Sequence, residues 1–200
     1  RGLCGSAIID VVAEMLKTGL IDSSGRFITK TDTPRLRRDG NSVEFVIAWK
    51  DETSNTSDIV VTQSDIREIQ LAKAAIYTGA SILMKHRKVQ PNDIRRVYLA
   101  GAFGNYVDLQ NAKIIGMYPD VPLEKVEFVG NTAGSGARMT LLSVNARKAA
   151  EDLAKRIEYV ELGADPNFQD EFLKATYLPH REPKRFPSVM AMLDVKSSKS

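Results

Sequence analysis

Cysteine is nearly absent from this chain of 200 residues, in which Cys4 is the only one. A single thiol cannot form an internal disulfide, and it cannot supply a cysteine-based zinc or iron–sulfur site. The sequence also lacks a secretory signal pattern and any apolar run of about 18 residues. We therefore expect a cytoplasmic protein with no membrane association and no resident metal site.

Net charge and histidine are also scarce. The chain has 28 basic and 25 acidic residues, and the resulting charge of +3 is too small to indicate a nucleic-acid partner. The two histidines, His86 and His180, are far apart and have no cysteine or carboxylate pattern around them. No G-x-S-x-G nucleophile motif occurs. The sequence therefore identifies no catalytic residue.

Two short apolar runs, each followed by a glycine-rich turn, are the most informative feature that is present. Residues 97–100 precede Gly101-Ala-Phe-Gly-Asn, and residues 126–129 precede the glycine-rich segment 130–137. Short apolar runs that stop at glycine are typical of buried strands. Glycine permits positive φ and a close approach of backbone to a ligand. Two such turns on one sheet predict a nucleotide-binding crevice.

Each turn also has a simpler interpretation, and both interpretations stay open. The Gly101 turn is equally compatible with a tight strand-to-helix connection that binds nothing. The second turn is no Walker A loop, because no lysine follows its glycines, and it does not match G-x-G-x-x-G. Close packing of a helix on a strand would explain it as well. Thr132 and Ser135 either donate to a ligand or cap the following helix.

Two carboxylates near these segments, Asp10 and Asp108, could reach Mg²⁺ through water. A helix cap or a surface charge is the favoured interpretation for each of them.

Helical and strand patterns alternate in the second half of the chain, which predicts an α/β layer structure. The expected helices cover residues 7–18, 64–87, 111–116 and 133–157. The expected strands cover residues 27–29, 43–49, 59–61, 97–100 and 126–129, with polar surface excursions at 31–41 and 50–57. We expect one lobe over residues 1–163 and an irregular C-terminal segment, residues 164–200, packed on it.

Residues 81–105 resemble the adenosine motif of the superfamily that contains acetate and sugar kinases, heat-shock chaperones and actin. Gly101-Ala102 stands where that motif usually has Gly-Gly, and Gly136-Ala137 matches the Gly-Ala step of the superfamily's second connecting helix. The resemblance implies one lobe of an actin-like, ribonuclease-H-like ATPase. Its mixed sheet would be flanked by helices, with a β-hairpin excursion near residues 27–62.

Four segments resemble more closely the C-terminal domain of the reductive activators of corrinoid proteins. They are residues 2–10, 70–76, 98–106 and 130–137. The resemblance implies ATP-dependent reduction of cobalamin from Co(II) to Co(I) on a corrinoid protein that serves methyl transfer. It also implies ATP with Mg²⁺ as cofactor and an iron–sulfur cluster in an N-terminal part that this chain lacks.

The same resemblance assigns the nucleotide contacts. The Gly101 turn would hold the adenosine side, the second turn would pack beneath the base, and the start of the first helix would line the cleft. The implied contact residues are Gly101, Ala102, Phe103, Gly104, Asn105, Gly134, Ser135, Gly136, Gly5 and Ser6. Because the superfamily's Asp-x-Gly phosphate hairpins are missing and the chain begins at Arg1, we expect a fragment with half of the ATP site.

Two alternative functions stay open. The lobe could belong to a phosphotransferase of the acetate- or sugar-kinase type. It could also be a non-catalytic module that contacts a partner through the polar excursion at residues 30–57. The oligomeric state is open as well, with a homodimer as one alternative. The isolated chain is expected to bind ATP weakly and to hydrolyse none.

Overall fold

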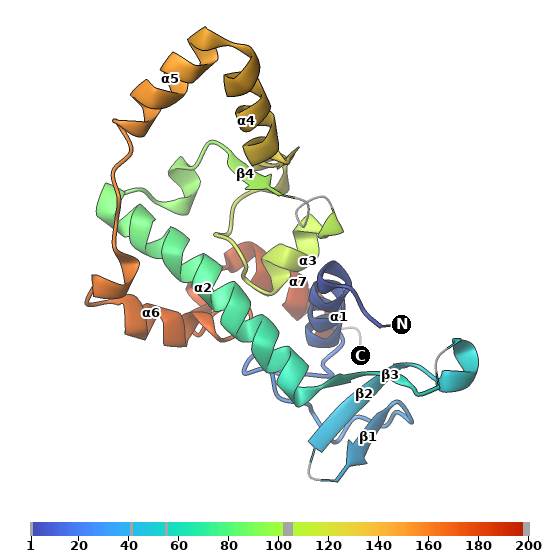
Figure 1. Ribbon diagram of the computed structural model, residues 1–200. Helices are drawn as coiled ribbons and strands as arrows, with labels where there is room; N and C mark the ends of the chain where they lie inside the picture. Colours follow the sequence, from blue (N-terminus) through green and yellow to red (C-terminus); the bar gives the residue numbers. More distant parts are fainter. Residues whose placement is uncertain (1, 41, 55, 102–105, 198–200) are drawn as a thin grey trace.

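The computed structural model describes residues 2–40, 42–54, 56–101 and 106–197 (Figure 1). The helices are α1 (Gly5–Lys17), α2 (Gln63–Arg87), α3 (Leu109–Ile114), α4 (Thr132–Leu142), α5 (Val144–Ala154), α6 (Phe168–Ala175) and α7 (Pro187–Ser197). The strands are β1 (Leu36–Asp39), β2 (Ser42–Ala48), β3 (Ile59–Thr62), β4 (Val97–Ala100) and β5 (Val126–Gly130). None of the described helices is long and apolar enough to cross a membrane.

Parallel and antiparallel strands are both present, but they form two separate sheets rather than the one mixed sheet predicted. β1, β2 and β3 form an antiparallel sheet in that order, and β4 pairs with β5 in parallel. The antiparallel sheet confirms the hairpin excursion expected near residues 27–62, and Figure 1 shows it projecting from the helices. The strand expected at residues 27–29 is wrong, because only an isolated bridge joins Ile21 and Phe27 there.

The long helix α2 begins where local sequence predicts it. Thr62 Oγ1 accepts a hydrogen bond from the Asp65 backbone N–H at 3.2 Å. The Asp65 carboxylate accepts one from the Thr62 N–H at 2.8 Å. These two bonds form a capping box, which satisfies donors that the first helical turn leaves free.

Removing either half of this box should weaken the chain measurably. We expect Thr62→Ala and Asp65→Ala each to lower the free energy of unfolding by about 1 kcal/mol. The double variant should lose less than the sum, because the two side chains serve one motif. Urea titration followed by circular dichroism measures all three losses. The exposed neighbour Ser64, changed to alanine, is the matched control, and strict additivity would contradict the coupling.

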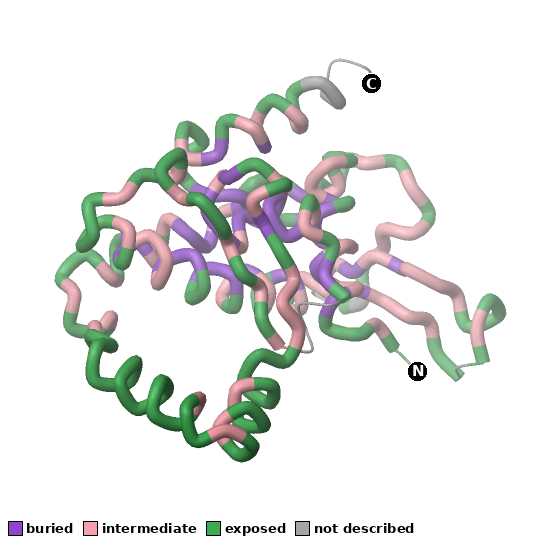
Figure 2. Tube along the Cα trace, turned by 90° about the horizontal axis from the view of Figure 1, so that it is seen from above, coloured by how far each residue is buried: buried purple, intermediate pink, exposed green. Residues whose placement is uncertain are grey.

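The hydrophobic core joins α1, the inward face of α2, β3, α3 and the C-terminal loop. Figure 2 shows the buried residues concentrated along these elements, while the helices at the lower edge are almost wholly exposed. Those exposed helices are α4 and α5, neither of which contains a buried residue. The core residues include Ile9, Val12, Ile21, Val61, Ile66, Ile114, Ile115, Leu178, Phe186 and Val189.

The single helix expected over residues 133–157 is wrong, because Ser143 divides it into α4 and α5. Ser143 has an extended backbone, with φ −137° and ψ 121°. Its hydroxyl accepts from the Ala146 N–H at 3.2 Å and so caps α5. A serine that bonds its own backbone in this way competes with helix continuation.

The irregular chain expected beyond Gly163 is also wrong, since α6 and α7 lie there. Phe186 and Val189 are fully buried in the core, and the rings of Phe168 and Phe172 stack with centroids 6.0 Å apart. The expected packing of this segment on the body is therefore present, and helices carry it. The division into residues 1–163 and 164–200 stays a prediction.

Candidate nucleotide site

Parallel pairing of β4 with β5 brings the two glycine turns side by side. Val97 is paired with Val126 at one end of the ladder, and Ala100 with Gly130 at the other. Just beyond the ladder, the Gly101 N–H donates to the Gly130 carbonyl at 2.8 Å. Both turns therefore leave the carboxyl ends of adjacent parallel strands, which is where α/β sheets bind ligands.

The backbone at both turns requires glycine. Gly101 has φ +94° and Gly130 has φ +66°, which is a left-handed conformation. A Cβ atom built on either residue would meet nothing within 4 Å. The conformation alone therefore accounts for these glycines, and the open space beside them leaves the backbone accessible.

Helix α4 begins directly after the second turn. The Asn131 side chain accepts from the Gly134 N–H at 2.9 Å, so Asn131 caps α4, a role that the sequence left open for Thr132 and Ser135. Gly134 and Ser135 are exposed, while Gly136 is half-buried and has open space at its Cβ position. The first two turns of α4 are therefore accessible beside Gly130.

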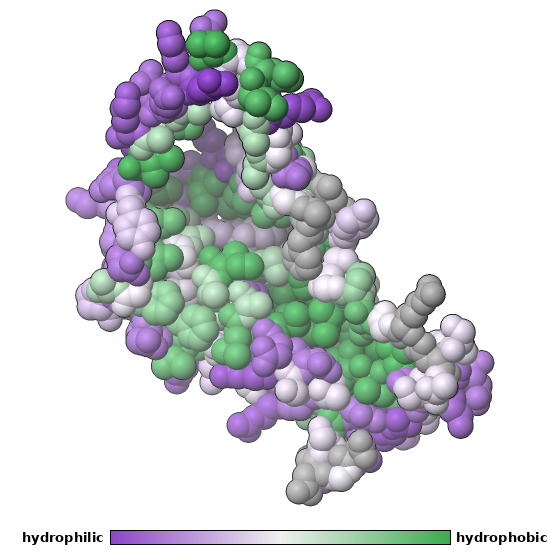
Figure 3. All heavy atoms as spheres, in the orientation of Figure 1, coloured by the Kyte–Doolittle hydropathy of each residue, from purple (hydrophilic) through white to green (hydrophobic). Residues whose placement is uncertain are grey.

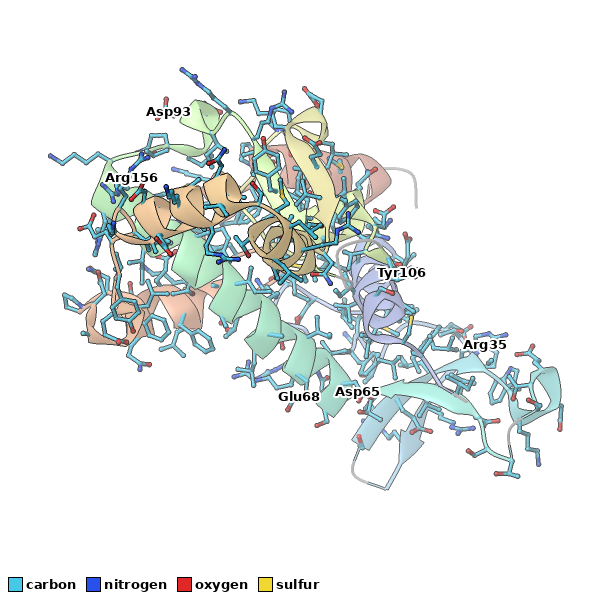
Figure 4. All side chains as sticks on the ribbon, turned by 45° about the horizontal axis from the view of Figure 1, so that its top comes forward. Arg35, Asp65, Glu68, Asp93, Tyr106 and Arg156 are labelled. Carbon is cyan, nitrogen blue, oxygen red and sulfur yellow. The ribbon has the colours of Figure 1, made fainter. Side chains whose placement is uncertain are left out.

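Four of the predicted contact residues, Ala102, Phe103, Gly104 and Asn105, lie outside the described residues. The chain is described again from Tyr106, whose side chain is 75% exposed and which Figure 4 places beside α1. Val107 follows and is buried in the core with Ile9 of α1.

Gly5 and Ser6 occupy the first turn of α1, and Cys4 precedes it as the cap residue. Ser6 is nearly buried, and its hydroxyl lies 3.3 Å from the Cys4 sulfur. Helix α3, which follows the Gly101 turn in the chain, packs against α1. The described contacts thus connect the two predicted regions through α3 rather than directly.

Asn111 of α3 joins the two carboxylates that the sequence singled out. Its side-chain amide donates to Asp10 at 2.9 Å, and its backbone N–H donates to Asp108 at 2.8 Å. Lys17 donates to the Asn111 amide oxygen at 3.2 Å. Asp108 is the N-cap of α3, which confirms the simpler interpretation of that residue. Sequence reasoning missed Asn111, because a spacing of about one hundred residues from Asp10 carries no local signal.

Both histidines lie apart from this region, and each makes a local hydrogen bond. His86 is exposed and its Nε2 lies 2.7 Å from Asp165. Hydrogen bonds from Asn167 and then from His86 lower the pKa of Asp165 to about 2. His180 is buried, and its Nδ1 accepts from the Glu182 N–H at 3.0 Å. Over residues 2–40, 42–54, 56–101 and 106–197, no group of three or more His, Cys, Asp or Glu side chains could hold a metal ion.

Comparison with known proteins assigns the fold. A family model described as the C-terminal domain of RACo, the ASKHA domain, matches residues 1–190. The chain belongs to this family. The predicted actin-like ATPase fold and the predicted resemblance to corrinoid activators are thereby confirmed.

Two curated proteins are relatives of this chain. The corrinoid activation enzyme RamQ of Eubacterium limosum is 38% identical over 184 residues, which cover 88% of the chain and 31% of RamQ. The [Co(II) methylated amine-specific corrinoid protein] reductase of Methanosarcina barkeri is 25% identical over 179 residues. These cover 86% of the chain and 28% of the reductase. The chain therefore spans under a third of the length of these relatives.

A solved structure gives the same result. A protein titled reductive activator for corrinoid, iron-sulfur protein superposes with a TM-score of 0.86 at 38% identity. The match covers 94% of this chain and 30% of that protein.

Proposed function

We propose that the protein containing this domain reduces cobalamin on a corrinoid protein from Co(II) to Co(I), with ATP driving the step. The adjacency of Gly101 and Gly130 at the ends of two parallel strands, in a chain of this family, carries the proposal. The curated relatives are named for corrinoid activation and for corrinoid protein reduction. ATP can drive such a step only if it binds two states of the protein with different affinity.

The nucleotide contacts proposed here are those predicted from sequence. The turn from Gly101 to Asn105 holds the adenosine side, Gly134 to Gly136 lie beneath the base, and Gly5 and Ser6 line the cleft. Magnesium usually binds through one or two carboxylates, substrate phosphates and water. Asp10 is the carboxylate left for that role, since Asp108 caps α3, and the Asn111 amide holds Asp10 by a hydrogen bond of 2.9 Å. When bound, the ion neutralises phosphate charge.

The electron donor would be an iron–sulfur cluster outside these 200 residues, since Cys4 is the only cysteine. The proposed partner is a corrinoid protein, as the names of the relatives suggest. A homodimer stays a prediction.

An unusually exposed pair of helices supports the view that this chain carries half of the site. We call α4, α5 and the segment to residue 161 the α4–α5 arch. Figure 3 shows hydrophobic residues on its surface and a hollow beneath it. Its exposed apolar side chains are Met139, Leu141, Leu142, Val144, Leu153, Ile157 and Tyr159. Parallel sheets are normally covered on both faces. The rest of the longer protein is proposed to cover β4, β5 and the arch.

Calorimetric titration with ATP and Mg²⁺ tests this proposal. We expect the full-length protein to bind at micromolar concentration and the 200-residue chain to show no binding in that range. In the full-length protein, Gly101→Val should weaken ATP binding and slow Co(I) formation by tenfold or more, because it alters a left-handed turn at the nucleotide.

Gly19 supplies the control, since its φ is +71° and its Cβ position is equally open, but it lies at the end of α1. Gly19→Val should leave ATP affinity and Co(I) formation close to those of the parent. Equal losses for the two variants would mean that Gly101 acts through stability alone. Micromolar ATP binding by the 200-residue chain would refute the half-site.

A further inference from the structure

Three arginines from three separate elements line one pocket on the body of the protein. Arg26 belongs to the turn after Ile21, Arg67 to the second turn of α2, and Arg181 to the loop after α6. The pocket has a volume of about 470 Å³, which lies within the range of small-molecule sites.

The lining of this arginine pocket is rich in positive charge. No aspartate or glutamate is among the residues that line it. Among the ion pairs recorded for the described part of the chain, none involves Arg26, Arg67 or Arg181. The nearest acid to Arg26 in sequence, Asp22, accepts from the Ser24 hydroxyl at 2.6 Å and from the Arg26 backbone N–H at 3.1 Å, and its carboxylate also interacts electrostatically with Arg26. The Asp22 carboxylate is therefore engaged in its own turn. Glu68 and Glu182 directly follow Arg67 and Arg181 but do not line the pocket, and Glu182 pairs with Lys174 and Arg185.

The two sides of the pocket are tied together by a buried glutamine. Gln70 donates from Nε2 to the Ser24 carbonyl at 3.0 Å and to the Thr176 carbonyl at 2.7 Å. The Leu178 N–H donates to the Ser23 carbonyl at 2.8 Å, which is a second bond between the same two segments. The turn that carries Arg26 and the loop that carries Arg181 are thus held against one face of α2.

Two further contacts make this frame rigid. Gly25 has φ +78°, and a Cβ there would lie 2.7 Å from the Gln70 side chain. The backbone of the turn therefore packs directly against that glutamine. The Arg181 guanidinium lies over the Tyr177 ring, 5.8 Å from its centroid, which orients its donors. Arg67 lies one turn before Gln70, on the same face of α2. This frame therefore fixes the backbone from which the three exposed arginines line one pocket.

We propose that this arginine pocket binds a small anion with two or more negative charges, carried by phosphate or carboxylate groups. The guanidinium fork matches both groups through paired hydrogen bonds. Three positive charges without an acid favour a polyvalent ligand over a single-charged one. The site is separate from the proposed nucleotide site: Figure 1 draws the start of α2 beside β3 and away from β4.

Titration of the 200-residue chain with pyrophosphate and, separately, with citrate in low-salt buffer tests the proposal. We expect one equivalent of anion to bind, more weakly as salt is raised. Arg67→Ala should weaken binding about tenfold or more, since it removes a charge-assisted contact. Arg67→Lys should recover part of the loss, because it restores the charge without the fork.

Arg156→Ala is the matched control, since Arg156 is an exposed arginine at the end of α5, as Figure 4 shows. It should leave affinity within about twofold. Tighter pyrophosphate than citrate binding identifies a phosphate ligand, and the reverse identifies a polycarboxylate. The proposal is overturned if neither anion binds, if Arg67→Ala and Arg156→Ala lose affinity equally, or if Gly101→Val abolishes binding. That last result would place the anion at the glycine turns. Unchanged circular dichroism of each variant excludes unfolding as the cause.

Discussion

Replacing Gly116 by alanine should lower the free energy of unfolding by more than about 3 kcal/mol. Gly116 follows α3 with φ +77°, and a Cβ built there would lie 2.2 Å from the Pro179 carbonyl oxygen. That oxygen cannot move freely, because it accepts from the buried Lys73 ammonium at 2.7 Å. A backbone clash against a fixed loop therefore adds to the strain of the left-handed conformation.

Gly19 separates the two contributions. Its φ is +71°, almost the same, but a Cβ there would meet nothing within 4 Å. Gly19→Ala should therefore show the conformational strain alone, about 1 kcal/mol. Urea unfolding of both variants, followed by circular dichroism, gives the difference. Similar losses of unfolding free energy at the two positions would show that the Pro179 loop moves to make room. The clash would then contribute nothing to the loss at Gly116.

The second large effect should be a rise in stability with pH between about 7 and 10, produced by Lys73. This residue is fully buried in α2, and its Nζ donates to the carbonyls of Tyr177 and Pro179. Burial lowers the pKa of Lys73 from 10.5 to about 7. Between these values the unfolded chain holds a proton that the folded chain has released. Stability therefore rises with pH in this window, by up to about 1.4 kcal/mol per unit.

Lys73→Met removes the titrating group and should flatten this slope. The absolute stability of the variant is a poor readout, because it also leaves two carbonyls without a donor. Lys85→Met is the control, since Lys85 is exposed on the same helix, and it should keep the parent slope. Burial raises the pKa of Tyr77 and of Tyr118, so measurements should stay below pH 10. Parallel pH profiles for the parent and Lys73→Met would remove Lys73 as the cause.

Local chemistry explains which parts of the fold were predictable. Helix α2 was placed to within a residue because Thr62 and Asp65 form its cap within four positions. Strands β4 and β5 were predicted because each apolar run stops at a glycine. The break at Ser143 was missed, since neither glycine nor proline marks it. The helices beyond Gly163 were missed because their prolines and charges conceal how deeply Phe186 is buried.

The sequence by itself determined the family, the two strands that end in glycine turns and the absence of any cysteine cluster from these 200 residues. Motifs of this kind are contiguous, so their spacing can be read directly. The tertiary structure decided which distant residues meet. It placed Gly101 beside Gly130 and joined Asp10 and Asp108 through Asn111. It also brought together the arginines of the arginine pocket. The pocket depends on how α2 packs against the loop after α6, and the Asp10–Asn111 contact on how α3 packs against α1. Both join residues about a hundred positions apart, a separation that no local pattern encodes.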